Sequence, residues 1–215
     1  PQPENFYGTL FAGDGSQVGG AESLLGSSVP AYGRLVLTTR DVEALFDVDP
    51  WSGPAMLKVE GKNGFSLMSK LSAAAGLVTN ANCAGESRAS NIGGFDSSTL
   101  SYVRLINTSD QEILNIRGTV YDPSGKVVGL ENSMLLSSLG PFEQAWIDRD
   151  RIAEKIKTEW NGDAMLEVNA KPGLKLLDLE YLPDRDAYLN FSCAENQETS
   201  TVFLQTSSNL SLIHI

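Results

Sequence analysis

The chain carries the same sequence pattern twice, and this duplication restricts its possible folds more than any other feature. Three pairs of segments match at a nearly constant offset of about 110 residues. These pairs are residues 8–11 with 118–121, residues 51–59 with 160–168, and residues 80–84 with 190–194. The second pair shares the pattern W-x-G-x-A-M-L-x-V, and both segments of the third pair contain one cysteine. The sequence therefore predicts two similar units within its 215 residues.

Within one unit, short β-branched and aromatic runs alternate with turn residues, which is typical of an all-β sandwich. In the second copy we predict strands at residues 102–106, 113–121, 145–148, 164–169, 174–179 and 187–193. The first two strands flank the turn residues 107–110 and are expected to form an antiparallel hairpin. Helical spacing predicts one short helix at 151–156, capped by Asp148 or Asp150, with a counterpart at 41–46. The predicted fold class is all-β, with two tandem Ig-like or fibronectin-like β-sandwich repeats, each crossed by one short helix.

The two copies begin at different points of the pattern. The second copy begins with the predicted hairpin, whereas the first starts at Pro1 and reaches Gly8 at once. We therefore expect the first repeat, residues 1–86, to lack its first strand or strands. The second repeat spans 87–196, and residues 197–215 form a surplus C-terminal hairpin. In this hairpin Val202 and Leu204 fall where Val103 and Leu105 stand in the second repeat.

A sandwich that lacks a strand exposes an open sheet edge, which proteins normally cover. We expect the C-terminal hairpin to cover it, with alternate side chains filling core pockets. The expected assembly residues are Val202, Phe203, Leu204, Leu210, Leu212 and Ile213. The hairpin can close on its own chain or insert into a neighbouring copy, and repeated head-to-tail insertion builds an open filament. The remaining alternative is that these residues are one part of a longer chain of repeats.

Composition excludes several function classes. Because His214 is the only histidine, imidazole catalysis, nucleophile–histidine triads and multi-histidine zinc sites have almost nothing to be built from. A net charge of −11 without a basic cluster argues against nucleic acid and anionic membranes as partners. No apolar run approaches the roughly 18 residues that a membrane helix needs. We therefore predict no enzymatic activity, no cofactor, no metal site and no membrane insertion.

Two cysteines occupy equivalent positions in the two copies. Cys83 and Cys193 can form one disulfide that links the repeats if a pseudo-twofold axis passes near them, and otherwise they are two separate thiols. The disulfide is favoured, since a single even pair in an acidic, Ser/Thr-rich chain is typical of an oxidising compartment.

The three tryptophans are expected to divide between two roles. Trp51 and Trp160 head the repeated motif, which favours a structural role at the end of a sandwich core. Trp146 has no counterpart in the first copy and is the candidate glycan contact, because exposed tryptophans stack on sugar rings. Acidic pairs such as Asp148 with Asp150 reproduce no calcium-binding loop and are expected at helix caps and turns.

Five motifs of the chain resemble a duplicated β module of uncharacterised function, found in secreted and surface proteins of Gram-negative bacteria. The motifs are GFDSS at 94–98, YVRLIN at 102–107, IRGTVYD at 116–122, WNGDA at 160–164 and NFSC at 190–193. The resemblance covers nearly the whole chain and implies an extracellular or cell-surface, bacterial setting and a non-enzymatic role. It brings no catalytic or ligand-binding residues with it.

Together these features predict an extracellular structural or adhesive β-sandwich protein that assembles head to tail into a filament by β-strand complementation. Its partners would then be other copies of itself. The alternative is a carbohydrate-binding or adhesin module without self-assembly, whose partners would be cell-surface glycans. Truncation of residues 201–215 distinguishes the two.

Overall fold

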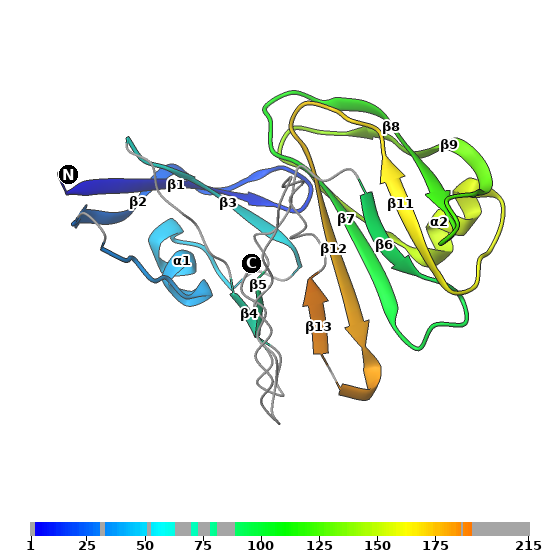
Figure 1. Ribbon diagram of the computed structural model, residues 1–215. Helices are drawn as coiled ribbons and strands as arrows, with labels where there is room; N and C mark the ends of the chain where they lie inside the picture. The colour runs from blue at the N-terminus through cyan, green and yellow to red at the C-terminus, as the bar shows by residue number, and fades with distance from the viewer. Residues whose placement is uncertain are drawn as a thin grey trace.

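The fold is described from a computed structural model that covers residues 3–30, 33–50, 53–62, 70–72, 78–80, 89–185 and 187–190. Within these residues the chain is mostly β-strand, every strand pairing is antiparallel, and two short α-helices are present (Figure 1). The all-β prediction is therefore confirmed at the level of a β-rich protein. The finer assignment to tandem Ig-like or fibronectin-like repeats stays a prediction.

Two four-stranded sheets form the second module. Its elements are β6 (Ala89–Gly93), β7 (Leu100–Asn107), β8 (Ile113–Tyr121), β9 (Val127–Leu139), β10 (Gln144–Asp148), α2 (Arg149–Ile156), β11 (Asp163–Val168), β12 (Leu174–Leu182), the 3-10 turn η1 (Pro183–Arg185) and β13 (Ala187–Asn190). One sheet has the strand order β10-β7-β12-β13, and the other has the order β6-β11-β8-β9.

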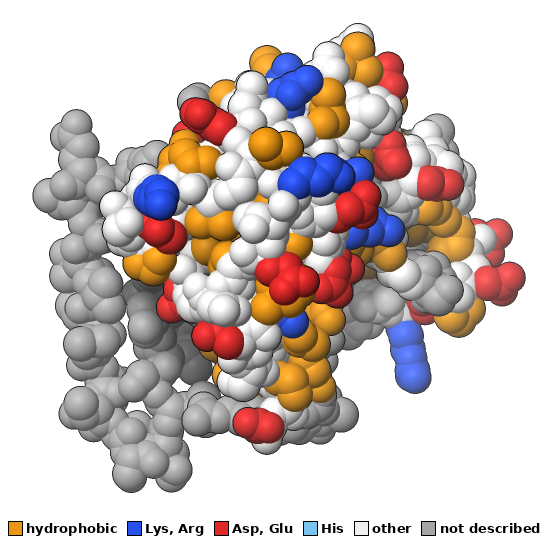
Figure 2. Space-filling model, turned by 90° about the vertical axis from the view of Figure 1, so that its right-hand side faces the viewer, with side chains coloured by type: hydrophobic (Ala, Val, Ile, Leu, Met, Phe, Trp, Pro, Cys, Tyr) orange, Lys and Arg blue, Asp and Glu red, His pale blue; other side chains and the backbone are white. Residues whose placement is uncertain are grey.

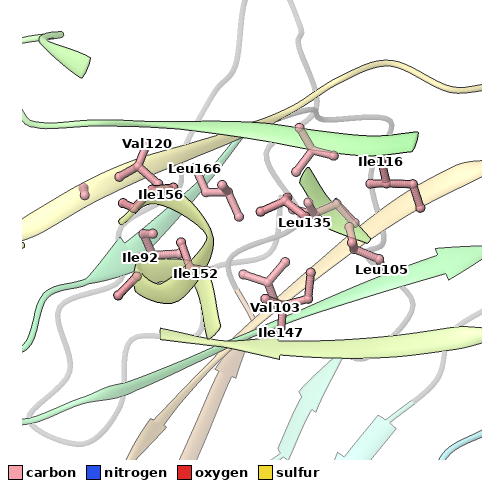
Figure 3. Close-up of a cluster of buried hydrophobic side chains, with 14 of the residues drawn as sticks. Ile92, Val103, Leu105, Ile116, Val120, Leu135, Ile147, Ile152, Ile156 and Leu166 are labelled. Carbon is pink, nitrogen blue, oxygen red and sulfur yellow. The ribbon is translucent and has the colours of Figure 1, made fainter. Parts of the chain in front are cut away.

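A single apolar core lies between these two sheets and under α2 (Figure 3). β7 contributes Val103 and Leu105, the opposite sheet contributes Ile116 and Leu166, and α2 closes one side with Ile152. Alternation is strict along β7, where every second residue is buried, as expected for a strand with one face on the core. Burial of this apolar surface is the main stabilising contribution to the module.

The predicted hairpin between residues 102–106 and 113–121 is wrong. β7 pairs with β10 and β12, whereas β8 pairs with β9 and β11, so the intervening turn carries the chain from one sheet to the other. The buried Asn107 fixes this corner, because its amide nitrogen donates to the carbonyl oxygens of Gln111 at 2.7 Å and Gly140 at 2.7 Å. Its side-chain oxygen accepts from the backbone N–H of Ser109 at 2.9 Å.

The first module repeats only part of this arrangement. Its elements are β1 (Glu4–Ala12), β2 (Gln17–Val29), α1 (Thr39–Phe46), β3 (Ala55–Glu60), β4 (Lys70–Ser72) and β5 (Val78–Asn80). A three-stranded sheet has the order β2-β1-β3, and among the described residues β4 pairs with β5 alone. By the sequence repeat, β1, β2, α1 and β3 correspond to β8, β9, α2 and β11, so the duplication is also a duplication of structure.

Both predicted helices are present and each has an N-terminal cap. The side chain of Asp148 accepts a hydrogen bond from the backbone N–H of Arg151 at 2.9 Å, as one of the two expected caps of α2. In α1, Thr38 and Asp41 form a reciprocal capping box. Each helix ends at a residue in the left-handed conformation, Asp47 and Lys157 respectively.

The two modules meet at more than one place: β5 lies close to β13, and the β1–β2 turn contacts the loop that precedes β10. Phe11 stacks on Phe142 with 4.2 Å between the ring centroids, and the N–H of Gln144 donates to the carbonyl of Gly13 at 2.8 Å. Asp14 and Glu143 form an isolated antiparallel bridge beside them. This contact joins a turn of the first module to a loop edge of the second.

Candidate assembly site

The site begins with the role of β7, the central strand that the second module has and the first lacks among its described residues. β7 lies between β10 and β12 and hydrogen-bonds to both. Its inward side chains, Val103 and Leu105, are each 0% exposed. Removal of such a strand would open two backbone edges and uncover the core on both sides of it.

Residues 35–38 of the first module show the effect of lacking that central strand. They correspond to 145–148 of β10, yet no residue from 33 to 38 belongs to a strand. Val36 is 68% exposed and Leu37 is half-buried, whereas Ile147, the counterpart of Leu37, is only 2% exposed. The segment therefore reaches the position of β10 but has no neighbouring strand to pair with in the described residues.

The opposite wall of the same core is open as well. Leu57 and Val59 on β3 are half-buried, whereas their counterparts on β11, Leu166 and Val168, are buried. Among the described residues of the first module, the buried apolar cluster consists of Leu10, Leu25, Val42 and Phe46, and Phe11 is buried outside it. The counterparts of Leu37, Leu57 and Val59 are all buried in the second module, so the first core is less enclosed at these positions.

A second open edge lies along β3. In the second module β11 is hydrogen-bonded on both sides, to β8 and to β6. Among the described residues β3 pairs only with β1. The first module thus lacks counterparts of both β6 and β7 within the part of the chain that the structure describes. An apolar surface next to an unpaired strand edge is suited to accepting an added strand.

Trp146, the candidate glycan contact, lies on β10 and is half-buried. The guanidinium carbon of Arg104 lies 4.0 Å from the centroid of its ring, and the ring of Tyr102 meets it edge-on at 6.2 Å. Arg104 also donates to the side-chain oxygen of Gln144 at 2.9 Å. Burial lowers the pKa of Arg104 to about 10, still above neutral pH. One face of Trp146 is therefore occupied by a protein cation.

Trp160 is buried in the core of the second module, where Phe95 packs edge-on against it at 5.6 Å. The structural role expected for this tryptophan is confirmed. Several other predicted residues lie outside the described residues: Trp51, Cys83, Cys193 and the assembly residues Val202, Phe203, Leu204, Leu210, Leu212 and Ile213. The disulfide between the cysteines stays a prediction.

A buried carboxyl group on β12 was missed by sequence reasoning. Asp178 is fully buried and accepts a hydrogen bond from the hydroxyl of Ser90 at 2.6 Å. Burial raises its pKa to about 7, the Ser90 hydroxyl partly opposes this shift, and Glu180 adds to it. The only sequence signal is an acid within the apolar run of β12, which strand alternation does not separate from an exposed position.

No group of three or more histidine, cysteine or acidic side chains suited to holding a metal ion occurs among the described residues. Neither α1 nor α2 has the length and apolar character that a membrane-crossing helix requires. Figure 2 shows the α2 and β9 side of the second module, where acidic and basic side chains are interspersed among scattered apolar ones. That face presents no continuous basic patch.

Comparison with known proteins finds no matching family model, no significantly similar curated protein and no significantly similar solved structure.

Proposed function

We propose that this protein is an extracellular structural or adhesive subunit that assembles head to tail by β-strand complementation. In this proposal the C-terminal segment of one copy completes the first module of the next. The observation that carries the proposal is the contrast at the β7 position, where Val103 and Leu105 fill the second core and no described residue fills the first. Main-chain hydrogen bonds supply affinity in this mode of recognition, and buried side chains fix the register.

Apolar burial would drive such an exchange. Full burial of one Val, Leu or Ile side chain contributes about 1.5–3 kcal/mol, which offsets part of the ordering cost of about 1–2 kcal/mol per residue, and backbone pairing adds to it. The incoming strand also pairs backbone groups of residues 35–38, which belong to no strand in the described structure. Because donor and acceptor lie at different places on the chain, each copy offers both, and the contact propagates.

The decisive experiment compares the full chain with a variant that lacks residues 201–215, by negative-stain electron microscopy and light scattering after size exclusion. We expect filaments of the full chain and none after truncation. As a matched control, Asn209→Asp leaves the apolar residues of the segment intact and should still assemble. Filaments that persist after truncation would overturn the proposal, and so would a full-length 23.1 kDa monomer.

The tandem Ig-like architecture and the disulfide between Cys83 and Cys193 form part of this proposal. A disulfide would keep the two modules together in an oxidising, extracellular setting. Mass spectrometry of peptides from protein digested without reductant tests it directly. Recovery of both cysteines as free thiols from protein purified under oxidising conditions would remove the disulfide from the proposal.

Carbohydrate binding is the second candidate, favoured by the cluster of Trp146, Tyr102 and Arg104 on one sheet of the second module. Aromatic rings bind the apolar faces of sugars, and a guanidinium can hydrogen-bond to their oxygens. A glycan array with the native protein and Trp146→Ala tests it. Binding that depends on Trp146, by a protein that remains monomeric, would favour this function over self-assembly.

A further inference from the structure

We infer that the C-terminal segment completes the first module with two strands, one at each of its two open edges, in the register of β6 and β7. Residues 199–203 take the place of β6 beside β3, and residues 210–215 take the place of β7 beside residues 35–38. This inference rests on the proposed function and specifies how its donor segment binds.

The alignment comes from extending the duplication beyond the cysteines. The offset that relates Cys83 to Cys193 continues without a gap to the end of the chain. Four serines and four apolar residues then fall on like residues: Ser90 on Ser200, Ile92 on Val202, Ser97 on Ser207, Ser98 on Ser208, Leu100 on Leu210, Ser101 on Ser211, Val103 on Ile213 and Leu105 on Ile215. The local V-x-L register, which pairs Val202 with Val103, gives as many identical residues over positions 199–215. Its last residues, however, fall on the start of β8, whose counterpart β1 the first module already has.

Several of the matched positions are buried or hydrogen-bonded in the second module. Ile92, Val103 and Leu105 are 1%, 0% and 0% exposed and form its core, and the segment has a β-branched residue at each of them. The hydroxyl of Ser101 accepts a hydrogen bond from the N–H of Gly93 at 2.8 Å, which ties β7 to β6 across the two sheets. Ser211 provides the same hydroxyl.

The strand pairings of the second module give the expected pairings in the first. Asn91 of β6 pairs with Met165 of β11, and the equivalent pair is Thr201 with Met56. Arg104 of β7 pairs with Trp146 of β10, and the equivalent pair is His214 with Val36. Val36 is the most exposed of the large apolar residues described, which fits a position that awaits a partner.

Of the positions that do not match, two affect the backbone path. Phe203 and Leu204 stand where the second module has Gly93 and Gly94, and a Cβ on Gly94 would lie 2.5 Å from the carbonyl oxygen of Gly162. The bend between the two donated strands therefore follows a different path. For this reason each strand needs its own test.

Engineered cysteine pairs test each strand in a background with Cys83→Ser and Cys193→Ser. Directly opposed residues on antiparallel strands have Cβ atoms about 4.5–5.5 Å apart, close enough for a disulfide after a small adjustment. We expect rapid disulfide formation for Met56→Cys with Thr201→Cys and for Val36→Cys with His214→Cys. Phe203→Cys serves as the control for both pairs. Paired with Met56→Cys it lies two residues from the expected partner Thr201, and paired with Val36→Cys it reports the V-x-L register.

The expected result is oxidation of both designed pairs on the order of tenfold faster than either pair with Phe203→Cys, read on non-reducing gels and by peptide mass spectrometry. Dominant bonding between positions 36 and 203 would overturn the two-strand register. So would an absence of bonds at both designed pairs in protein that still assembles, and in that case the proposed function itself would stand.

Whether these engineered disulfides form within one chain or between two chains tests the proposed function separately. Disulfides between chains show that a neighbouring copy donates the strands. Disulfides within one chain support the register but overturn the filament, because the segment then closes on its own first module.

Nested truncations give a second measurement. Loss of residues 210–215 should remove protection from amide hydrogen exchange at residues 35–38, and loss of 199–215 should remove it along the outer edge of β3 as well. If neither truncation changes exchange at these two edges, the inference is overturned.

Discussion

The two modules share a capped helix and the strand order β2-β1-β3, which matches β9-β8-β11, yet they bury their cores to different extents. Leu166 and Val168 of the second module are buried, and their first-module counterparts Leu57 and Val59 are half-buried. Local sequence does not explain this difference, because the W-x-G-x-A-M-L-x-V motif surrounds both sets. What differs is that β6 and β7 pack on the second core, whereas no strand among the described residues takes their place on the first. Two copies of one local motif can therefore reach different degrees of burial when the strands around them differ.

The largest expected difference concerns one equivalent leucine. Leu166→Ala should destabilise the second module by about 2–5 kcal/mol, because the cavity forms in a closed core. Leu57→Ala should cost less than half as much in the protein truncated at residue 200, where the site is half-open to water. Denaturant unfolding of the two variants against their parents measures this. Equal costs would show that the first core is as closed as the second.

Unfolding of the second module should depend on pH because Asp178 is buried there. The folded pKa of Asp178, about 7, exceeds the ordinary value of 3.8, so the contribution of its protonated form is complete below about pH 4 and is lost as the pH rises through 7. We expect the unfolding free energy to fall between pH 4 and 8 by an amount on the order of a few kcal/mol.

Asp178→Asn should remove most of this pH dependence and stabilise the protein at pH 8. By the pairings of β12 with β13 and of β4 with β5, Leu71 corresponds to Glu180, and two residues earlier the sequence has Ser69 where the second module has Asp178. Unchanged pH dependence in Asp178→Asn would assign the effect to other carboxyl groups.

An effect of intermediate size is expected for the equivalent strand glycines Gly118 and Gly8. A Cβ on Gly118 would meet Leu135 at 2.7 Å and the Glu167 carbonyl at 3.0 Å, whereas a Cβ on Gly8 would meet only side-chain atoms of Leu25 at 2.8 to 3.0 Å. Gly118→Ala should therefore cost about 1–3 kcal/mol, and Gly8→Ala less, since Leu25 can move into an open core. Thermal unfolding midpoints of both variants test this order.

The smallest effect should come from the helix caps. Thr38→Ala removes one half of a reciprocal capping box, and Asp148→Ala removes a single side-chain acceptor, so each should cost about 0.5–2 kcal/mol. Asp148→Asn keeps an accepting oxygen and serves as the control. If Thr38→Ala has no effect on stability while Asp148→Ala does, α1 is held mainly by Val42 and Phe46 rather than by its cap.

Sequence reasoning found what local patterns encode. The duplication, both helices and the Asp148 cap were predicted, because each depends on residues a few positions apart. The β7–β8 hairpin was predicted wrongly, since the turn chemistry of 107–110 suits both a hairpin and a corner between sheets. The distinction depends on Asn107, whose partners Leu139 and Gly140 lie more than thirty residues away. The burial of Asp178 is likewise decided by β6, a strand distant in sequence.

The stacking of Phe11 on Phe142 has a consequence for symmetry. It joins the β1–β2 turn to the loop before β10, and these are different surfaces of two similar bodies. Arg34 and Pro123 are the repeat counterparts of Gln144 and Gly13. A twofold axis through this contact would require a hydrogen bond from the Arg34 N–H to the Pro123 carbonyl, which the described residues do not form. In Figure 1, β8 accordingly ends on the side away from the first module. The Phe11–Phe142 contact is therefore heterologous, and copies of a subunit joined by contacts of this kind extend head to tail or close into a ring, whereas a twofold contact stops at a pair.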